Sequence, residues 1–347
     1  CDTDFGPEGA TDLKATYPGK GREARWRKVP SRTTTGFVEL STLLRPNAGV
    51  VAYALTFLQA DTETRVNLHL GTSGAYRLFV NGVKASASDA YHAPQVDQAR
   101  VQVRLRKGVN RVLLKLCQES GPLGFYLRQE RADGAPASAR VVLPDAVPPL
   151  EKGPPPSPTT LPTLADGYAA LVKARPNDAA LRSDLATVLG YTRAFDEREQ
   201  SAWREADKAS QAKPDDPELH LRAAALDAYD FNERRRHITE ALRLDPRSPW
   251  TRLAMAQHEL QQDHPELALP MYEKLLEDFP KLAPAWLGKA RALEALGQKP
   301  LALNVVEEAF ARLPHVPQVA REAASASRRM DRLQEAEGRM RTALALR

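Results

Sequence analysis

Histidine and cysteine are the residue types in this sequence best suited to bind a metal ion or to act as catalytic base or nucleophile. No His-Glu-x-x-His and no Cys-x-x-Cys occurs, and these are the spacings that bring two ligands to one metal. His258 and His264 are six residues apart, which does not place them on one face of a helix. The sequence therefore predicts no metal site and no other cofactor. The histidines are His69, His92, His220, His237, His258, His264 and His315.

Serine nucleophiles and phosphate-binding loops have recognisable local sequences, and none of them is present. The chain lacks the Gly-x-Ser-x-Gly turn of hydrolases, the Walker loop and Gly-x-Gly-x-x-Gly. Two pairs of carboxylates, Asp227 with Asp230 and Glu307 with Glu308, fall in helical sequence and are interpreted as solvated helix surface. The sequence thus predicts a protein that is not an enzyme and that works by binding.

The two cysteines are too few for a disulfide framework. Cys117 ends an apolar run that begins at Val112, which predicts a small packed thiol. Cys1 begins the chain, and this start resembles a mature bacterial lipoprotein, in which the first cysteine is lipidated. The resemblance implies lipidation of Cys1 and a lipid anchor in a membrane of the bacterial cell envelope. Asp2 resembles the inner-membrane retention signal of enteric bacteria. That signal does not act in all bacteria, so the sequence leaves both the inner and the outer membrane as alternatives.

Residues 22–132 alternate between apolar and polar side chains, which is typical of strands with one buried face. Val66, Leu68 and Leu70 are one example. The dipeptides Asn81-Gly82 and Lys107-Gly108 suit tight hairpin turns that need a positive φ. Seven or more short strands in this range predict an antiparallel β-sandwich.

Two short motifs in this region resemble the galactose-binding-like jelly roll. They are the strand–Asn-Gly segment Tyr76–Val83 and the segment Val101–Leu116 with its internal Leu-x-x-Gly-x-Asn pattern, and the resemblance covers roughly residues 24–131. It implies a glycan as partner, and the candidate sugar-binding loop holds Asp89, Tyr91 and His92. The alternative is that the domain binds no sugar and only packs against other parts of the protein or acts as a spacer between them.

The net charge of +5 comes from cations that outnumber acids before residue 133. A solvated strand face explains this surplus, and contact with an anionic polymer or lipid headgroups is the alternative. Nucleic acid is not an expected partner, because no basic helix or stacking motif accompanies the charge. No apolar run approaches the roughly 18 residues needed to span a membrane.

Prolines dominate residues 133–162, and such a run is predicted to be an extended linker. Residues 1–21 are polar, poorly patterned and interpreted as an N-terminal tether. The predicted fold class is therefore multidomain β + α. Along the chain, the sequence predicts a tether (1–21), an antiparallel β-sandwich (22–132), a proline-rich linker (133–162) and an α-helical solenoid (163–347).

The solenoid is inferred from prolines that follow helix ends with spacings of 38, 32, 34 and 34 residues. A period of 34 with paired helices is the signature of the tetratricopeptide repeat (TPR), whose units must stack to bury their apolar stripes. One unit is expected to contain Trp286 in its first helix. The unit before it is expected to contain Trp250 and Tyr272, with Trp250 equivalent to Trp286. About five hairpins are expected. The array has no polar capping helix, from which we expect the chain to continue past Arg347. The prolines are Pro176, Pro214, Pro246, Pro280 and Pro314.

In this family ligands bind the concave groove lined by the first helix of each pair. The resemblance implies a protein partner, and the Lys/Asn pattern of the carboxylate-clamp subfamily is absent. The candidate groove residues are His220, Asp227, Leu287, Arg291, Glu294, Arg321, Ser325 and Arg328.

The predicted function is that of a non-catalytic lipoprotein scaffold that binds an envelope protein through its TPR groove. Two alternatives stay open. The chain could be the non-catalytic front of a larger, transglutaminase-like envelope enzyme, as the uncapped end suggests. It could instead be a carbohydrate-binding envelope protein, as the jelly-roll resemblance suggests.

Overall fold

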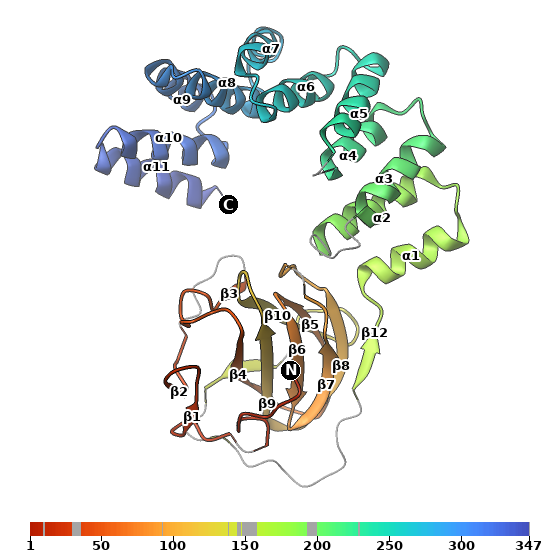
Figure 1. The fold of residues 1–347 in the computed structure, drawn as a ribbon, viewed down its shortest axis with the longest axis vertical. Helices are drawn as coiled ribbons and strands as arrows, with labels where there is room; N and C mark the ends of the chain where they lie inside the picture. Colours follow the sequence, from red (N-terminus) through yellow and green to blue (C-terminus); the bar gives the residue numbers. More distant parts are fainter. Residues whose placement is uncertain are drawn as a thin grey trace. The chain divides into compact units, whose positions relative to one another are not determined.

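Strands and helices follow each other along the chain in the order that the sequence pattern predicts (Figure 1). The structure is a computed structural model, and it describes residues 1–9, 11–29, 36–91, 93–137, 139–143, 147, 158–192, 200–227 and 230–346. It contains two compact units, residues 1–205 and 206–347, and each is described by itself.

Within the described residues, ten strands form two five-stranded antiparallel sheets. The first has the order β12-β8-β5-β10-β3 and the second β11-β4-β9-β6-β7. A separate hairpin pairs β1 (Thr16–Pro18) with β2 (Glu23–Arg25). The strands of the first sheet are β3 (Phe37–Glu39), β5 (Thr64–Thr72), β8 (Ala99–Leu105), β10 (Gly124–Arg131) and β12 (Thr159–Leu161). Those of the second are β4 (Val50–Ala60), β6 (Ala75–Val80), β7 (Val83–Ser88), β9 (Gly108–Gln118) and β11 (Arg140–Val142).

The two sheets share one apolar core, so they form a β-sandwich. Val66, Leu68 and Leu70 of β5 are buried in the same cluster as Leu114 and Leu116 of β9. Every second residue of each strand points inward, which is why the alternating pattern identified the core. The Asn81-Gly82 turn joins β6 to β7, and both residues have positive φ, at 50° and 83°.

The ends of the sandwich differ from the sequence interpretation. Residues 133–162 were interpreted as a linker, but β11 pairs with β4 and β12 pairs with β8. Both are edge strands, where neighbouring prolines do not interrupt a ladder on two sides. Of the prolines between residues 143 and 158, only Pro158 lies within the described residues. The sequence predicts a tether at residues 1–21, but Asp2, Thr3 and Glu8 contact Arg77, Lys115 and Arg111 of the second sheet.

The rest of the described chain is helical, and α1 begins after Thr163, whose side chain and that of Asp166 form a capping box. The helices are α1 (Leu164–Ala174), α2 (Ala179–Thr192), α3 (Gln200–Ala212), α4 (Pro217–Leu226), α5 (Phe231–Leu244), α6 (Pro249–Gln261), α7 (Pro265–Asp278), α8 (Ala283–Ala295), α9 (Lys299–Arg312), α10 (Pro317–Arg329) and α11 (Leu333–Ala345). Among the described helices, none is both long and apolar enough to cross a bilayer.

In the second unit the helices pack as hairpins, and the first helices of neighbouring hairpins touch as well. The burial pattern repeats with the predicted period. Thr251, Ala285 and Val319 each lie five residues after a closing proline, and all three are buried. Equivalent positions therefore face equivalent neighbours, which is the packing of a tetratricopeptide array.

Trp250 and Trp286 do not occupy equivalent positions, although the sequence interpretation paired them. Trp250 lies four residues after Pro246 and is 56% exposed, whereas Trp286 lies six residues after Pro280 and is 6% exposed. A shift of two residues turns a helical side chain by about 200°, so one ring faces solvent and the other faces the core. The stacked hairpins are present around both.

Candidate functional site

The groove positions predicted on α8 and α10 share one phase of the repeat. Leu287 lies seven residues after Pro280, and Arg321 lies seven residues after Pro314. On α8, Arg291 and Glu294 follow Leu287 at the i+4 and i+7 positions, so the three lie on one helix face. Ser325 and Arg328 follow Arg321 in the same way on α10.

The exposed charges on this face are positive. Arg291, Arg321 and Arg328 are exposed, and none of them has an ion-pair partner among the described residues. Glu294 is instead paired with Arg329, whose guanidinium lies 2.9 Å from it and 3.3 Å from Glu322. The acids on this side of α8 and α10 are therefore already neutralised, and three arginines are left for a ligand.

Two of the predicted groove residues are wrong, because both are buried. His220 lies six residues after Pro214, so it is equivalent to Trp286 and not to Leu287. Asp227 is the buried C-cap residue of α4. The prediction was one residue out of phase in this repeat, and Leu221 occupies the position equivalent to Leu287.

The correct phase shows a contact that the sequence interpretation missed. At the sixth residue after the closing proline, a side-chain nitrogen bonds to the carbonyl of that proline in three repeats. Arg182 Nε lies 2.7 Å from the Pro176 carbonyl, and Trp286 Nε1 lies 2.9 Å from that of Pro280. His220 Nε2 lies 3.1 Å from the Pro214 carbonyl. This contact satisfies a carbonyl near the end of a helix and fixes where the next helix begins.

His220 also contacts a second buried histidine. Its Nδ1 lies 3.1 Å from Nδ1 of His237, and Nε2 of His237 lies 3.2 Å from Asp207. Burial lowers the pKa of His237 from its usual value of 6.5, and the nearby Arg236 lowers it further, against the opposing effect of Asp207. His237 is therefore held neutral at neutral pH.

We expect the helical array to lose stability as the pH falls below 6.5. The unfolded state takes up a proton on His237 below this pH while the native state resists it, so the loss reaches at most about 1.4 kcal/mol per pH unit for this proton. Urea unfolding followed by helical circular dichroism between pH 7.5 and 5 measures it. His237→Asn should flatten the dependence, and His315→Gln, at an exposed position, should not. Equal slopes for all three proteins would contradict the expectation.

In the sandwich, residues 1–9 and 11–15 form an N-terminal segment that covers the outer face of the second sheet. Lys115 is fully buried there and donates to Glu8 Oε1 and to the Thr3 carbonyl, at 2.6 Å each. The guanidinium of Arg111 donates to Thr11 Oγ1 at 2.7 Å and to the Glu8 carbonyl at 2.9 Å. Both buried cations thus find acceptors in this segment, although Nε of Arg111 has none among the described residues, and these contacts explain why the segment does not behave as a tether.

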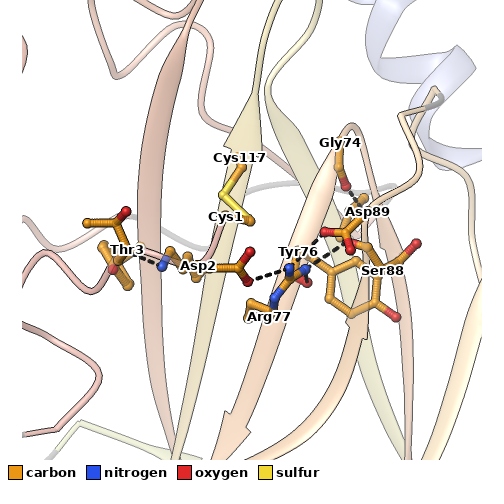
Figure 2. Close-up of a disulfide and its surroundings, with 12 residues drawn as sticks. Cys1, Asp2, Thr3, Gly74, Tyr76, Arg77, Ser88, Asp89 and Cys117 are labelled. Carbon is orange, nitrogen blue, oxygen red and sulfur yellow. Dashed lines mark hydrogen bonds and ion pairs between the residues drawn. A yellow bond between two sulfur atoms is a disulfide. The ribbon is translucent and has the colours of Figure 1, made fainter.

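The same segment is covalently attached to the sheet. A disulfide joins Cys1 to Cys117 on β9, and Arg77 on β6 pairs with Asp2 at 2.8 Å and with Asp89 at 2.7 Å (Figure 2). The prediction of a packed free thiol at Cys117 is therefore wrong. A sulfur atom in a disulfide cannot also carry a thioether-linked lipid. The predicted lipidation of Cys1 therefore requires a form of the protein without this disulfide.

The residues of the predicted sugar-binding loop differ in their surroundings. The carboxylate of Asp89 is used by Arg77, whereas Tyr91 is 50% exposed. His92 lies outside the described residues.

On the outer face of the first sheet, a polar cluster surrounds the buried His69. Its Nε2 lies 2.8 Å from Glu130, and Arg128 pairs with both Glu130 and Asp97. Burial alone would raise the pKa of Glu130, but contacts with His69 and Arg128 outweigh it and lower this pKa to about 2. The cluster joins the segment before β8 to β10. No group of three metal-ligating side chains occurs among the described residues.

No model of a protein family matches this chain, and no curated protein matches it. Among the solved structures similar to it are MamA and two that are named as tetratricopeptide repeat proteins. MamA (41-end) from Desulfovibrio magneticus RS-1 is 17% identical, with 49% of this chain and 94% of that chain covered and a TM-score of 0.37. A tetratricopeptide repeat protein from Parabacteroides merdae ATCC 43184 is 12% identical, with coverages of 52% and 70% and a TM-score of 0.46. YrrB, a TPR protein with an unusual peptide-binding site, is 16% identical, with coverages of 53% and 93% and a TM-score of 0.35. Since these TM-scores are below 0.5, the tetratricopeptide assignment rests on the repeat period and the helix packing.

Proposed function

We propose that the chain is a non-catalytic scaffold of the bacterial cell envelope, and that its helical array binds an acidic segment of a partner protein. The observation on which this depends is the set of exposed, unpaired arginines Arg291, Arg321 and Arg328 on the same face of α8 and α10. Arginine binds carboxylates through two parallel hydrogen bonds, so such a row suits an extended acidic peptide.

The envelope location is supported by the disulfide. Disulfides persist in oxidising compartments such as the periplasm and the cell surface, and they are rare in the cytosol. Cys1 is used by that bond. The lipid anchor stays a prediction, and it requires the form of the protein in which Cys1 and Cys117 are not joined.

Charge reversal of the three arginines tests the proposed groove. The full chain with Arg291→Glu, Arg321→Glu and Arg328→Glu should bind fluorescent Asp/Glu-rich peptides of about 12 residues at least about tenfold more weakly, since each exposed charge contributes roughly 0.2–1 kcal/mol. Fluorescence polarisation at two salt concentrations measures the affinity. The wild type should also bind more weakly at the higher salt.

A matched control changes the net charge equally but elsewhere. Arg243, Arg247 and Arg341 are exposed and lie outside the first helices of the hairpins. Their replacement by glutamate should leave the affinity within about twofold, because screening weakens distant charges. The proposal fails if both triple variants weaken binding equally, or if the wild type does not distinguish acidic peptides from lysine-rich ones.

A further inference from the structure

A cavity of about 840 Å³ lies between the β1–β2 hairpin, the outer face of β4 and the segment that contains Arg45 and Pro46. Small-molecule sites commonly have volumes of about 300–1,000 Å³. The N-terminal segment forms one side of it, with Phe5 and Pro7, and Tyr91 from the loop after β7 forms another. The cavity is thus built by residues that precede the range resembling a galactose-binding-like domain together with residues inside that range.

Aromatic rings supply much of the lining. Tyr17 and Trp26 pack edge to face with their centres 6.4 Å apart, and Tyr53 lies on β4. Phe5 and Tyr91 also line the cavity, and they are 42% and 50% exposed. Exposed apolar surface that is gathered in one concavity is a common sign of a binding site.

The charged lining is predominantly cationic. Lys20 donates to the carbonyls of Ala48 and Gly49, and the guanidinium of Arg22 donates to the carbonyl of Arg45. These acceptors are neutral, so they orient the cations without cancelling their charge. Among the described residues, no carboxylate forms an ion pair with Lys20, Arg22 or Arg45, whereas Arg25 is paired with Glu23.

A polar atom at the cavity also lacks a partner. Nε1 of Trp26 is buried and has no acceptor among the described residues. A buried N–H without an acceptor costs roughly 1–3 kcal/mol. Because this nitrogen is covered by other atoms, an oxygen of a bound ligand would satisfy it only if the Trp26 ring turned toward the cavity.

We propose that this cavity binds a short oligosaccharide that contains uronic acid. The flat C–H faces of the sugar rings would pack on Tyr91 and Tyr53, and the carboxylate would lie beside Arg22 and Arg45. After a turn of its ring toward the cavity, the N–H of Trp26 would donate to a sugar oxygen. The unpaired cations favour an anionic ligand, the aromatic faces favour a ligand with one apolar face, and the unused donor favours a ligand with many acceptors. A neutral sugar lacks the negative charge. The cavity lies under a hairpin and does not follow a free strand edge, which favours a compact saccharide over an extended peptide.

Titration of the full, oxidised chain with digalacturonate and trigalacturonate tests the proposal, with isothermal calorimetry and tryptophan emission as readouts. We expect saturable binding that is at least tenfold tighter than binding of the neutral galactobiose. Trp26→Phe keeps an aromatic ring but removes the donor, and it should weaken binding about three- to tenfold. The absence of uronate binding at millimolar concentrations, or equal binding of the neutral disaccharide, would overturn the proposal.

Two further variants separate the cavity from non-specific effects. Tyr91→Ala changes a half-exposed side chain that the fold does not need, and it should weaken uronate binding at least fivefold. Tyr191→Ala removes a ring that is 70% exposed on α2, away from the cavity lining, and should change nothing. Equal responses of these two variants would overturn the assignment of the site. Displacement of uronate by an acidic peptide with tighter affinity would overturn the assignment of the ligand.

Discussion

Replacement of Cys117 by serine should lower the free energy of unfolding of the sandwich by about 4–5 kcal/mol. The bond to Cys1 spans 116 residues, and in the chain-entropy model a bond that closes about 100 residues stabilises the native state by about 4.7 kcal/mol. Guanidinium titration followed by hydrogen-exchange mass spectrometry measures the change in peptides from residues 36–131, separately from the helices.

The matching variants show whether the effect comes from the bond. Cys1→Ser should cost as much as Cys117→Ser, and the double variant should cost no more than either, because all three remove the same interaction. Intact mass should rise by about two hydrogens on reduction of the wild type. A lipid-sized mass on Cys1 together with a titratable thiol at Cys117 would contradict the expected disulfide.

Tyr272→Ala should destabilise the helical array by about 3–5 kcal/mol, the usual cost of deleting a large ring from a core. Tyr272 on α7 is fully buried, and its ring lies against Gly288 on α8. A Cβ at position 288 would come within 2.3 Å of the ring, so the two helices approach closely only because residue 288 is glycine. Urea unfolding of the full chain, followed by circular dichroism at 222 nm, measures the loss.

Tyr272→Phe is the matched control for this prediction. Burial raises the pKa of Tyr272 to about 12, and its hydroxyl has no hydrogen-bond partner among the described residues. Removal of the hydroxyl should therefore change stability by less than about 1 kcal/mol.

A double-mutant cycle isolates the contact with Gly288. Gly288→Ala should be destabilising in the wild type, by about 1–3 kcal/mol from overpacking. In the Tyr272→Ala background it should be almost neutral, because the added methyl group enters the vacated space. Additive effects would show that the ring and the glycine are not packed as described.

The alternating pattern predicted the core of the sandwich but not what covers its outer face. Val112, Leu114 and Leu116 on β9 point inward as expected. Arg111 and Lys115 alternate with them, and such residues normally face water. Here they are buried and donate to the carbonyls of Glu8 and Thr3 in the N-terminal segment. Periodicity shows which side of a strand a residue occupies, but it contains no information on a segment about 100 residues away.

The disulfide was missed for a related reason. Cysteine spacing identifies a site when its members are close in sequence, and a pair at the two ends of a long loop has no such signature. The spacing of 34 residues puts the candidate groove residues of α8 and α10 in one phase, whereas on α4, where the spacing to the next unit is 32, the candidates are one residue out of phase. Alignment on the closing prolines would have placed Leu221 correctly and would have shown that His220 stands where Trp286 stands.

The bond between the first residue and β9 closes residues 1–117 into a covalent ring. A protease that cut a single peptide bond inside this ring would open it without releasing a fragment, since the two pieces would remain linked through sulfur. Such a nicked molecule would stay in one piece, heavier only by the water added in the cleavage, until a reductant reached it. A single backbone break between residues 1 and 117 therefore leaves the chain covalently connected.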